Sequence, residues 1–256
     1  MSDYDVFVQN LKRKSGIDLL FYKEAQMKRR LTSLRDKRGY QDFFSYFEAC
    51  QHNRELFHEL LDRLTINVSE FYRNQKRWVV LEEKVLPHLL EKRGKLKIWS
   101  AACSTGEEPY TLAMLLNKYL SPQEFEIIAT DIDENALKSA ETGIYPDRAL
   151  KEAPKEVVSK YFNKKEYGYQ INPQLKKNIT FKKHNLLSDS YGENYDLIVC
   201  RNVLIYFTED AKRLIYEKFS RSLKDQGFFF VGSTEQIFTP TDYNFNVFDT
   251  FFYQKI

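Results

Sequence analysis

The sequence has few of the residues that hold small secreted or metal-stabilised proteins together. Its 256 residues include three cysteines, Cys50, Cys103 and Cys200, which are odd in number and far apart. They form no Cys-x-x-Cys pair and have no nearby histidines at the spacing of metal ligands. We therefore expect neither disulfide bonds nor a structural zinc site, and no metal in the functional site.

The sequence also lacks a long apolar run and a strong charge of one sign. No hydrophobic stretch approaches the length of a membrane span, and the N-terminal Met1–Asp5 has neither the basic nor the apolar region of a signal peptide. We therefore expect a cytoplasmic protein without direct membrane insertion. The formal net charge of +3 does not by itself indicate a nucleic-acid partner. A hydrophobic content of 43% is enough to build a core.

Glycine is scarce as well, and only Gly106 lies within residues 95–110. This segment predicts a short buried strand, a turn of small residues and a helix, because Gly106 permits a tight turn and Pro109 suits the first turn of a helix. Small side chains and unpaired helix amides would form a ligand crevice there. The G-x-G-x-x-G pattern is absent, and Glu107 and Glu108 stand where a pyrophosphate would bring negative charge. The crevice therefore favours a cationic or neutral ligand.

Residues 1–64 predict a small all-helical domain, because apolar residues recur at helical spacing and proline is absent. Its second segment has seven cations between Lys23 and Arg38 against two acids. These cations form either a solvated helix surface or a docking face for an acidic partner. Nucleic acid is the less favoured partner, because aromatic residues are not interleaved with the cations. The candidate docking residues are Lys28, Arg29, Arg30, Arg35, Lys37 and Arg38.

Residues 65–77 predict an ordered linker, because they combine hydrogen-bonding, β-branched and aromatic side chains. Two interpretations of this linker remain open. Asn67 or Ser69 could cap a helix, or the linker side chains could reach into the crevice of the next domain. An amphipathic helix is then predicted from Trp78 to Leu90.

From Lys95 onward, predicted strands and helices alternate, which indicates an α/β domain with a doubly wound, mostly parallel sheet. Its ligand would lie at the carboxyl ends of the strands. Asp131 ends the second strand, where this fold places an acid for a ribose hydroxyl pair, whereas Asp133 is better placed to cap the following helix. Beyond the first strand and its helix to about residue 120, the predicted strands are residues 125–130, 195–200, 227–232 and 247–253, and the predicted helices are residues 134–141 and 209–223.

Residues 145–180 interrupt this alternation with three prolines, many lysines and many aromatic residues. They predict an inserted β-subdomain that contains a hairpin at residues 167–172. The α/β domain thus extends over residues 78–256, with this insertion inside it.

Acids after the first and second strands, without a pyrophosphate cradle, suit S-adenosylmethionine, which has a ribose and a sulfonium charge but no phosphate. Three segments then resemble signatures of the chemotaxis receptor (protein-glutamate) methyltransferases, the CheR family. Residues 99–110, Trp-Ser-Ala-Ala-Cys-Ser-Thr-Gly-Glu-Glu-Pro-Tyr, resemble motif I of this family. Residues 65–73, Thr-x-Asn-x-Ser-x-Phe-Tyr-Arg, and residues 200–207, Cys-Arg-Asn-Val-Leu-Ile-Tyr-Phe, resemble two further signatures. The resemblance spans the whole chain and implies a class I S-adenosylmethionine-dependent methyltransferase fold with a helical docking domain in front of it.

The resemblance implies an enzyme that transfers a methyl group from S-adenosylmethionine to glutamate side chains and releases S-adenosylhomocysteine. Its partners would be the cytoplasmic helical bundles of methyl-accepting chemotaxis receptors, whose adaptation it would tune in bacterial signalling, and it would act as a monomer. The family pattern puts Arg73 and Tyr206 closest to the transferring methyl group, as the catalytic pair. The implied cofactor-binding residues are Asn67, Ser69, Arg73, Glu107, Asp131, Asn185, Leu186, Arg201 and Asn202.

Two residues depart slightly from the family pattern. Tyr72 stands where phenylalanine is more usual, and Ser69 stands where threonine is common. In some enterobacterial relatives the inserted subdomain binds a receptor C-terminal pentapeptide, and no matching site is identified in this sequence.

The chemistry of the residues agrees with such a transfer. A glutamate side chain with an ordinary pKa of about 4.3 is ionised at neutral pH, so no general base is needed. Arg73 could orient a carboxylate and Tyr206 could offer a hydroxyl, although a linker salt bridge and a packed loop aromatic are the alternatives for these two residues. No Asp/Asn-Pro-Pro-Tyr run follows the fourth strand, which argues against an amide or exocyclic amine acceptor.

The sequence disfavours two other classes of protein. The missing glycine pattern disfavours a nicotinamide-dependent oxidoreductase. The acids and the arginine-bearing linker disfavour a non-catalytic adaptor that has kept only the fold.

Overall fold

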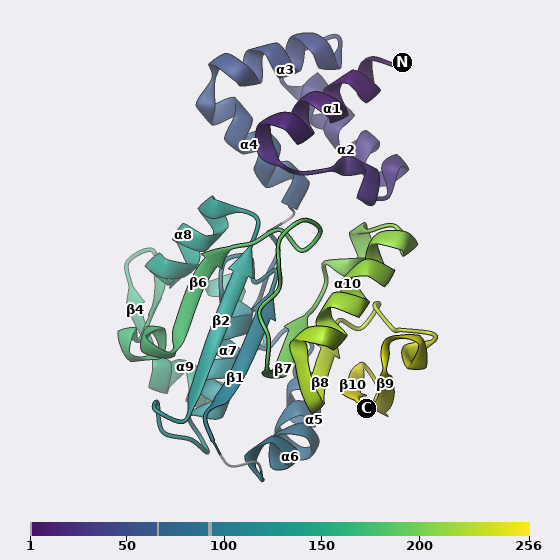
Figure 1. Cartoon of the computed structure of the whole chain (residues 1–256). Coiled ribbons are helices and arrows are strands. Elements are labelled where there is room, and N and C mark those ends of the chain that lie inside the picture. Colours follow the sequence, from purple (N-terminus) through teal and green to yellow (C-terminus); the bar gives the residue numbers. More distant parts are fainter. Residues whose placement is uncertain (1, 66, 92–93) are drawn as a thin grey trace. The chain divides into compact units, whose positions relative to one another are not determined.

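The computed structural model describes residues 2–65, 67–91 and 94–256, and the chain divides into two compact units (Figure 1). The helical unit contains the residues up to Asn67 together with Ile205–Leu214. The α/β unit contains Val68–Leu204 and Ile215–Ile256. The segment Ile205–Leu214, which follows a strand of the α/β unit along the chain, therefore packs with the helical unit.

The N-terminal part of the helical unit is all-helical, as its apolar spacing predicts. Ser2 and Asp5 form a capping box at the start of its first helix, and Gly16 ends that helix with a φ of 77°. The buried core includes Phe7, Leu11 and Leu60. The helices are α1 (Asp3–Ser15), α2 (Glu24–Lys37), α3 (Phe43–His52) and α4 (Arg54–Thr65), with a 3₁₀ turn η1 (Leu19–Phe21) between α1 and α2.

The α/β unit is built on a seven-stranded sheet with the strand order β6-β2-β1-β7-β8-β10-β9 (Figure 1). The strands from β6 to β8 are parallel, and β10 runs antiparallel to β8 and β9. The predicted fold class, a doubly wound and mostly parallel sheet with an N-terminal helical domain, is confirmed. The strands are β1 (Leu96–Ala101), β2 (Phe125–Asp131), β6 (Ile179–Lys183), β7 (Tyr195–Cys200), β8 (Leu223–Val231), β9 (Phe245–Asp249) and β10 (Phe252–Lys255).

Helices cover both faces of the sheet, and successive side chains of a strand pack against helices on opposite faces. Phe228 and Phe230 of β8 belong to the same buried cluster as α7 and the helical run that begins at Gln75. Phe229, between them, packs against Phe219 of α10, with ring centroids 5.0 Å apart. This period of two explains why the apolar run Phe228–Val231 is buried on both faces of the sheet.

The main helices agree with the predicted ones, with small shifts at their ends. The helix predicted from Trp78 begins at Gln75 and contains a π-helical turn, and Pro87 lies in its last segment. The bounds are α5 (Gln75–Val80), η2 (Leu81–Val85), α6 (Leu86–Leu90), α7 (Glu107–Leu116), α8 (Glu134–Thr142), α9 (Lys155–Tyr161) and α10 (Glu209–Ser222). The other 3₁₀ turns are η3 (Asp147–Leu150), η4 (Pro173–Asn178), η5 (Leu204–Tyr206) and η6 (Pro240–Tyr243).

The inserted subdomain is confirmed as a small antiparallel sheet with the order β3-β5-β4. The bounds are β3 (Ile144–Tyr145), β4 (Phe162–Lys165) and β5 (Gly168–Ile171). Its hairpin joins β4 to β5, and it therefore starts before the predicted residues 167–172.

One predicted strand was wrong, and one strand of the sheet was not predicted. The aromatic tail at residues 247–253 is not one strand: β9 and β10 pair as an antiparallel hairpin, because the chain turns at Phe251, which has a φ of 72°. Strand β6 forms the parallel edge of the sheet beside β2. It was not predicted, because its lysines and half-exposed positions mask the apolar pattern of a strand.

Candidate active site

The loop between β1 and α7 turns sharply at the carboxyl edge of the sheet. Ala102, Ser104 and Gly106 have positive φ angles of 61°, 50° and 93°. A Cβ atom on Gly106 would lie 2.7 Å from the Cβ of Ala140, so only glycine fits at this position. The expected tight turn before α7 is therefore formed by one glycine and its small neighbours.

Asp131, at the end of β2, is tied to this loop. Its Oδ2 accepts a hydrogen bond from the Ser104 amide at 2.7 Å, and its Oδ1 accepts one from the Asp133 amide at 2.9 Å. The carboxylate is only 7% exposed, and burial raises the pKa of Asp131 to about 6. The carboxylate can still accept from a further donor, which fits a ribose hydroxyl. Asp133, as expected, caps α8.

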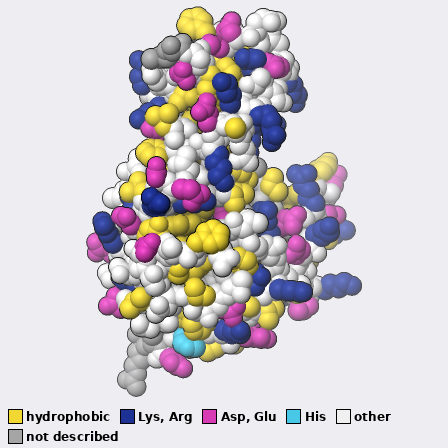
Figure 2. All heavy atoms as spheres, turned by 90° about the vertical axis from the view of Figure 1, so that its right-hand side faces the viewer, with side chains coloured by type: hydrophobic (Ala, Val, Ile, Leu, Met, Phe, Trp, Pro, Cys, Tyr) yellow, Lys and Arg dark blue, Asp and Glu magenta, His cyan; other side chains and the backbone are white. Residues whose placement is uncertain are grey.

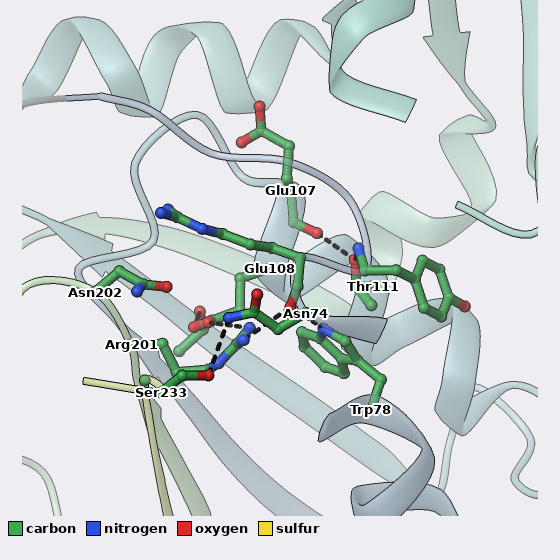
Figure 3. Close-up of polar contacts among 12 residues, drawn as sticks. Asn74, Trp78, Glu107, Glu108, Thr111, Arg201, Asn202 and Ser233 are labelled. Atoms are coloured by element: carbon green, nitrogen blue, oxygen red, sulfur yellow. Dashed lines mark hydrogen bonds and ion pairs between the residues drawn. The ribbon is translucent and has the colours of Figure 1, made fainter. Parts of the chain in front are cut away.

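Glu107 and Glu108 begin α7 and point in opposite directions (Figure 3). Glu107 is 4% exposed and accepts hydrogen bonds from the hydroxyls of Thr105, at 2.7 Å, and Ser69. Burial raises the pKa of Glu107. No lysine or arginine within the described part of the chain forms an ion pair with it. A buried carboxylate without a cation fits the ammonium group of S-adenosylmethionine.

Glu108 lies on the interior side and takes part in a buried polar network. The Ser100 hydroxyl donates to Glu108 Oε1 at 2.8 Å, and Arg201 Nη1 lies 3.7 Å from Glu108 Oε2. Desolvation, only partly offset by Arg201, raises the pKa of Glu108 to about 7. The Arg201 guanidinium lies over the rings of Trp78 and Phe230, at 5.2 and 4.7 Å from their centroids. The side chain of Arg201 is therefore engaged within the protein.

The linker forms a compact turn around Arg73. Arg73 Nη1 donates to the Val68 carbonyl at 3.0 Å, and α5 begins only after Asn74. Neither Asn67 nor Ser69 therefore caps that helix, and the interpretation that the linker side chains face a ligand stays a prediction. Asn67 belongs to the helical unit, where its amide donates to the Thr65 hydroxyl, and Ile66, within the predicted linker, lies outside the described residues.

Asn185 and Leu186 directly follow β6, in register with the end of β2. The His184 amide donates to the Asp131 carbonyl at 2.9 Å, and Asn185 Oδ1 accepts from the Leu187 amide at 3.0 Å. Ser69, Glu107, Asp131, Asn185 and Leu186 thus all belong to loops at or beside the carboxyl edge of one sheet.

Asn202, after β7, is held by a residue that the sequence did not single out. Asn202 has a φ of 62°, and its amide donates to Glu235 Oε2 at 2.7 Å. The Gly232 amide donates to the same oxygen at 2.7 Å. A Cβ atom on Gly232 would collide with this oxygen, so the position requires glycine. Gly232 is therefore the signal in the sequence that could have indicated the contact between Glu235 and the backbone.

Tyr206, the other predicted catalytic residue, belongs to the helical unit. Its carbonyl accepts from the Lys23 amide at 2.9 Å, and the Arg30 guanidinium lies 5.4 Å from the centroid of its ring. Tyr22 and Phe207 form an isolated β-bridge beside it. The start of α2 therefore holds this loop, and a place for Tyr206 next to the methyl group stays a prediction.

Most of the candidate docking cations are engaged within the helical unit. Arg38 forms a bidentate ion pair with Glu59, with distances of 2.6 and 2.7 Å. Arg35 pairs with Asp36 and lies over Phe43, and Lys28 lies over the ring of Tyr4. Arg29 and Lys37 are exposed and form no ion pair with any described residue. They are eight residues apart, which puts them on one face of α2, roughly two turns apart.

The sheet and its carboxyl edge define the class of protein. A mostly parallel doubly wound sheet, with a glycine turn after β1 and acids at its carboxyl edge, is typical of the class I S-adenosylmethionine-dependent methyltransferase fold.

Comparison with known proteins identifies the family. Residues 2–65 match the family model of the CheR methyltransferase all-alpha domain, and residues 67–252 match that of the CheR methyltransferase SAM binding domain. The chain therefore belongs to the CheR methyltransferase family, and its cofactor is S-adenosylmethionine.

Several relatives support this assignment over nearly the full length. A chemotaxis protein methyltransferase of Listeria monocytogenes is 46% identical over 99% of this chain and 97% of its own. A chemotaxis protein methyltransferase of Borreliella burgdorferi is 37% identical over 87% and 83% of the two chains. Chemotaxis protein methyltransferase 1 of Pseudomonas aeruginosa is 32% identical over 92% and 90%.

The described residues have neither a candidate membrane span nor a candidate metal site. None of their helices is long and apolar enough to cross a membrane. Over the same residues, histidine, cysteine, aspartate and glutamate nowhere form a group of three that could hold a metal ion.

Proposed function

We propose that this protein is a protein-glutamate O-methyltransferase that modifies the cytoplasmic helical bundles of chemotaxis receptors and so tunes adaptation. The observation that carries the proposal is the family match over both the helical and the cofactor-binding parts of the chain. The full-length similarity to chemotaxis protein methyltransferases supports it. On this proposal the protein acts in the cytoplasm as a monomer.

The acceptor chemistry requires little of the enzyme beyond positioning. When bound, S-adenosylmethionine supplies a methyl group whose transfer to a carboxylate oxygen leaves S-adenosylhomocysteine and moves no proton. A glutamate carboxylate is ionised at neutral pH, so the site needs no general base. The remaining task is to align the carboxylate and remove its water, which is a matter of entropy and desolvation.

We assign this task to groups on both sides of the crevice. Asp131 would accept the ribose hydroxyls, and Glu107 would face the cofactor ammonium from its buried position. Asn185 and Leu186 would border the adenine, with Asn67, Ser69 and Asn202 completing the cofactor site. Arg73 would orient the acceptor carboxylate with its fork of donors, and Tyr206 would offer its hydroxyl near the methyl group.

Two assays test this function. The wild-type protein should incorporate base-labile methyl groups into a receptor cytoplasmic fragment, and Arg73→Ala should lower the rate sharply at saturating cofactor. Calorimetric titration should show binding of S-adenosylmethionine and S-adenosylhomocysteine but not of NAD. Binding of NAD alone would exclude a methyltransferase, and a full rate in Arg73→Ala would remove Arg73 from its proposed role.

We further propose that α2 docks the enzyme on an acidic face of the receptor through Arg29 and Lys37. These are the cations of the candidate set that are both exposed and without an internal ion pair or ring contact within the described residues. The other candidates stabilise the helical unit itself. Arg30, in particular, contacts the ring of Tyr206, so its replacement would disturb the site as well as the surface.

The double reversal Arg29→Glu/Lys37→Glu should raise the KM for the receptor fragment and leave the Kd for S-adenosylhomocysteine unchanged. The effect should shrink at high salt, because exposed charges are screened. Lys151→Glu/Lys155→Glu is the matched control, since both lysines are exposed and the change in net charge is the same. Equal KM values for the two double variants would show that Arg29 and Lys37 belong to a solvated helix surface and do not dock the receptor.

A further inference from the structure

The backbone carbonyl of Arg73 is held by two side chains, those of Trp78 and Arg201, which Figure 3 labels. Trp78 Nε1 donates to it at 3.1 Å, and Arg201 Nη2 donates to it at 2.8 Å. Trp78 lies one helical turn further along the chain, whereas Arg201 follows β7, more than a hundred residues away. Both lone-pair positions of this oxygen are therefore used by side chains that come from different elements.

The turn around Arg73 needs such support. Tyr72 and Asn74, on either side of Arg73, have φ angles of 55° and 60°. Two non-glycine residues in the left-handed region persist only where surrounding contacts over-determine them. The Tyr72 amide donates to Thr111 Oγ1 at 3.3 Å, and Asn74 Nδ2 donates to Ser233 Oγ at 3.1 Å. Contacts from four sides thus fix the three residues of the turn.

The two donors on the Arg73 carbonyl are themselves immobilised. The Trp78 side chain is buried, and its ring contacts Tyr72 and Phe230. The guanidinium of Arg201 lies over Trp78 and Phe230 and beside the Glu108 carboxylate, which compensates its charge. Because both side chains are buried in close packing, the position of the carbonyl is set before any ligand arrives.

We propose that Trp78 and Arg201 are positioning residues for Arg73. By fixing its carbonyl, they fix the direction in which the Arg73 side chain leaves the turn and reaches the acceptor carboxylate. Glu108 serves this arrangement by lying beside the buried guanidinium of Arg201, which explains why one of the two acids of the β1–α7 loop points into the protein. The inference rests on the proposed role of Arg73 in methyl transfer.

A double-mutant cycle on the full-length protein tests it. Trp78→Phe keeps the ring packing and removes the donor, so it should lower kcat at saturating cofactor and receptor fragment by about fivefold, the size expected for one hydrogen bond. In the Arg73→Ala background the same replacement should have no further effect on kcat, because the side chain that it positions is gone. Arg201→Lys, which keeps the charge beside Glu108 but loses the planar fork, should show the same pattern.

Trp99→Phe is the matched control. It makes the same chemical change at the other tryptophan of the chain, whose Nε1 donates to Thr130 Oγ1 at 2.8 Å. Its fold effect on kcat should be equal in the wild-type and Arg73→Ala backgrounds, and thermal melting verifies that every variant is folded. Equal fold effects of Trp78→Phe in both backgrounds would overturn the inference. A full rate in Arg73→Ala alone would overturn the proposed role of Arg73, which is a different result.

Discussion

Replacement of Asp131 by asparagine should separate cofactor affinity from stability. The carboxylate accepts hydrogen bonds from backbone amides and can still accept one from a ligand hydroxyl. Asparagine has nearly the same shape, but an NH2 group, which is a donor, replaces one of the two carboxylate oxygens. The asparagine side chain also cannot be ionised. The variant therefore tests two points: whether Asp131 binds the ribose, and how much free energy the ionisation of a buried carboxylate costs.

The effect of Asp131 on stability follows from its pKa. Burial raises this pKa from 3.8 to about 6. A tenfold change in an ionisation constant corresponds to about 1.4 kcal/mol, so keeping the group ionised near neutral pH costs about 3 kcal/mol. A raised pKa in the folded state contributes stability that is complete below the unfolded pKa and disappears as the pH rises through the folded pKa. Between about pH 7.5 and about pH 5, the wild type should therefore gain about 1.4 kcal/mol of unfolding free energy relative to Asp131→Asn.

The effect on binding has the opposite dependence on pH. Ligand hydroxyls prefer the ionised carboxylate, so the affinity of the wild type for S-adenosylhomocysteine should fall about tenfold over the same decrease in pH. Asp131→Asn should lack this part of the pH dependence. At neutral pH its Kd should be roughly a hundredfold higher than that of the wild type, since charge-assisted hydrogen bonds are the stronger ones.

Urea unfolding and calorimetric titration of both proteins at the two pH values provide the assay. Glu108, with a pKa of about 7, titrates in both proteins, so its contribution cancels in the comparison. An identical pH dependence of stability in the two proteins would refute the argument from burial. A wild-type affinity in Asp131→Asn would refute the ribose assignment.

Two further variants test the loops at the edge of the sheet. Glu235→Ala should raise the KM for S-adenosylmethionine, because the Asn202 amide loses its acceptor, and Glu235→Gln should restore most of the wild-type value, since an amide oxygen can still accept. If both variants behave alike in steady-state kinetics, Glu235 does not act through this contact. Gly106→Ala should lower the unfolding free energy by about 2–4 kcal/mol, because a positive φ and a close approach to Ala140 coincide there. An unchanged urea midpoint for this variant would contradict the structure of the β1–α7 turn.

The strands and helices of the core could be predicted because their signals are local. β1, β2, β7 and β8 are apolar runs followed by turn residues, and the alternation with helices predicts a parallel sheet. β6 was missed because an edge strand tolerates lysines on its exposed side. The break between β9 and β10 was missed because neither glycine nor proline marks the turn at Phe251.

The candidate site was predictable only where one segment carries the whole pattern. Gly106 and the two acids after it could be read from a single stretch of sequence. That Glu108 faces Arg201 rather than the crevice depends on packing between α7 and the loop after β7, which no spacing in the sequence reports. The support of Asn202 by Glu235 is likewise a contact between a side chain and a distant backbone amide.

A map of the modified residues tests most directly our proposal that this protein esterifies glutamate side chains of a chemotaxis receptor. The full-length protein is incubated with S-adenosylmethionine and a receptor cytoplasmic fragment, and the products are analysed by tandem mass spectrometry before and after mild base. We predict methyl esters on glutamates of the helical bundle that disappear after base and do not form with Asp131→Asn. Base-stable methyl groups on lysine, arginine or glutamine side chains would contradict the account.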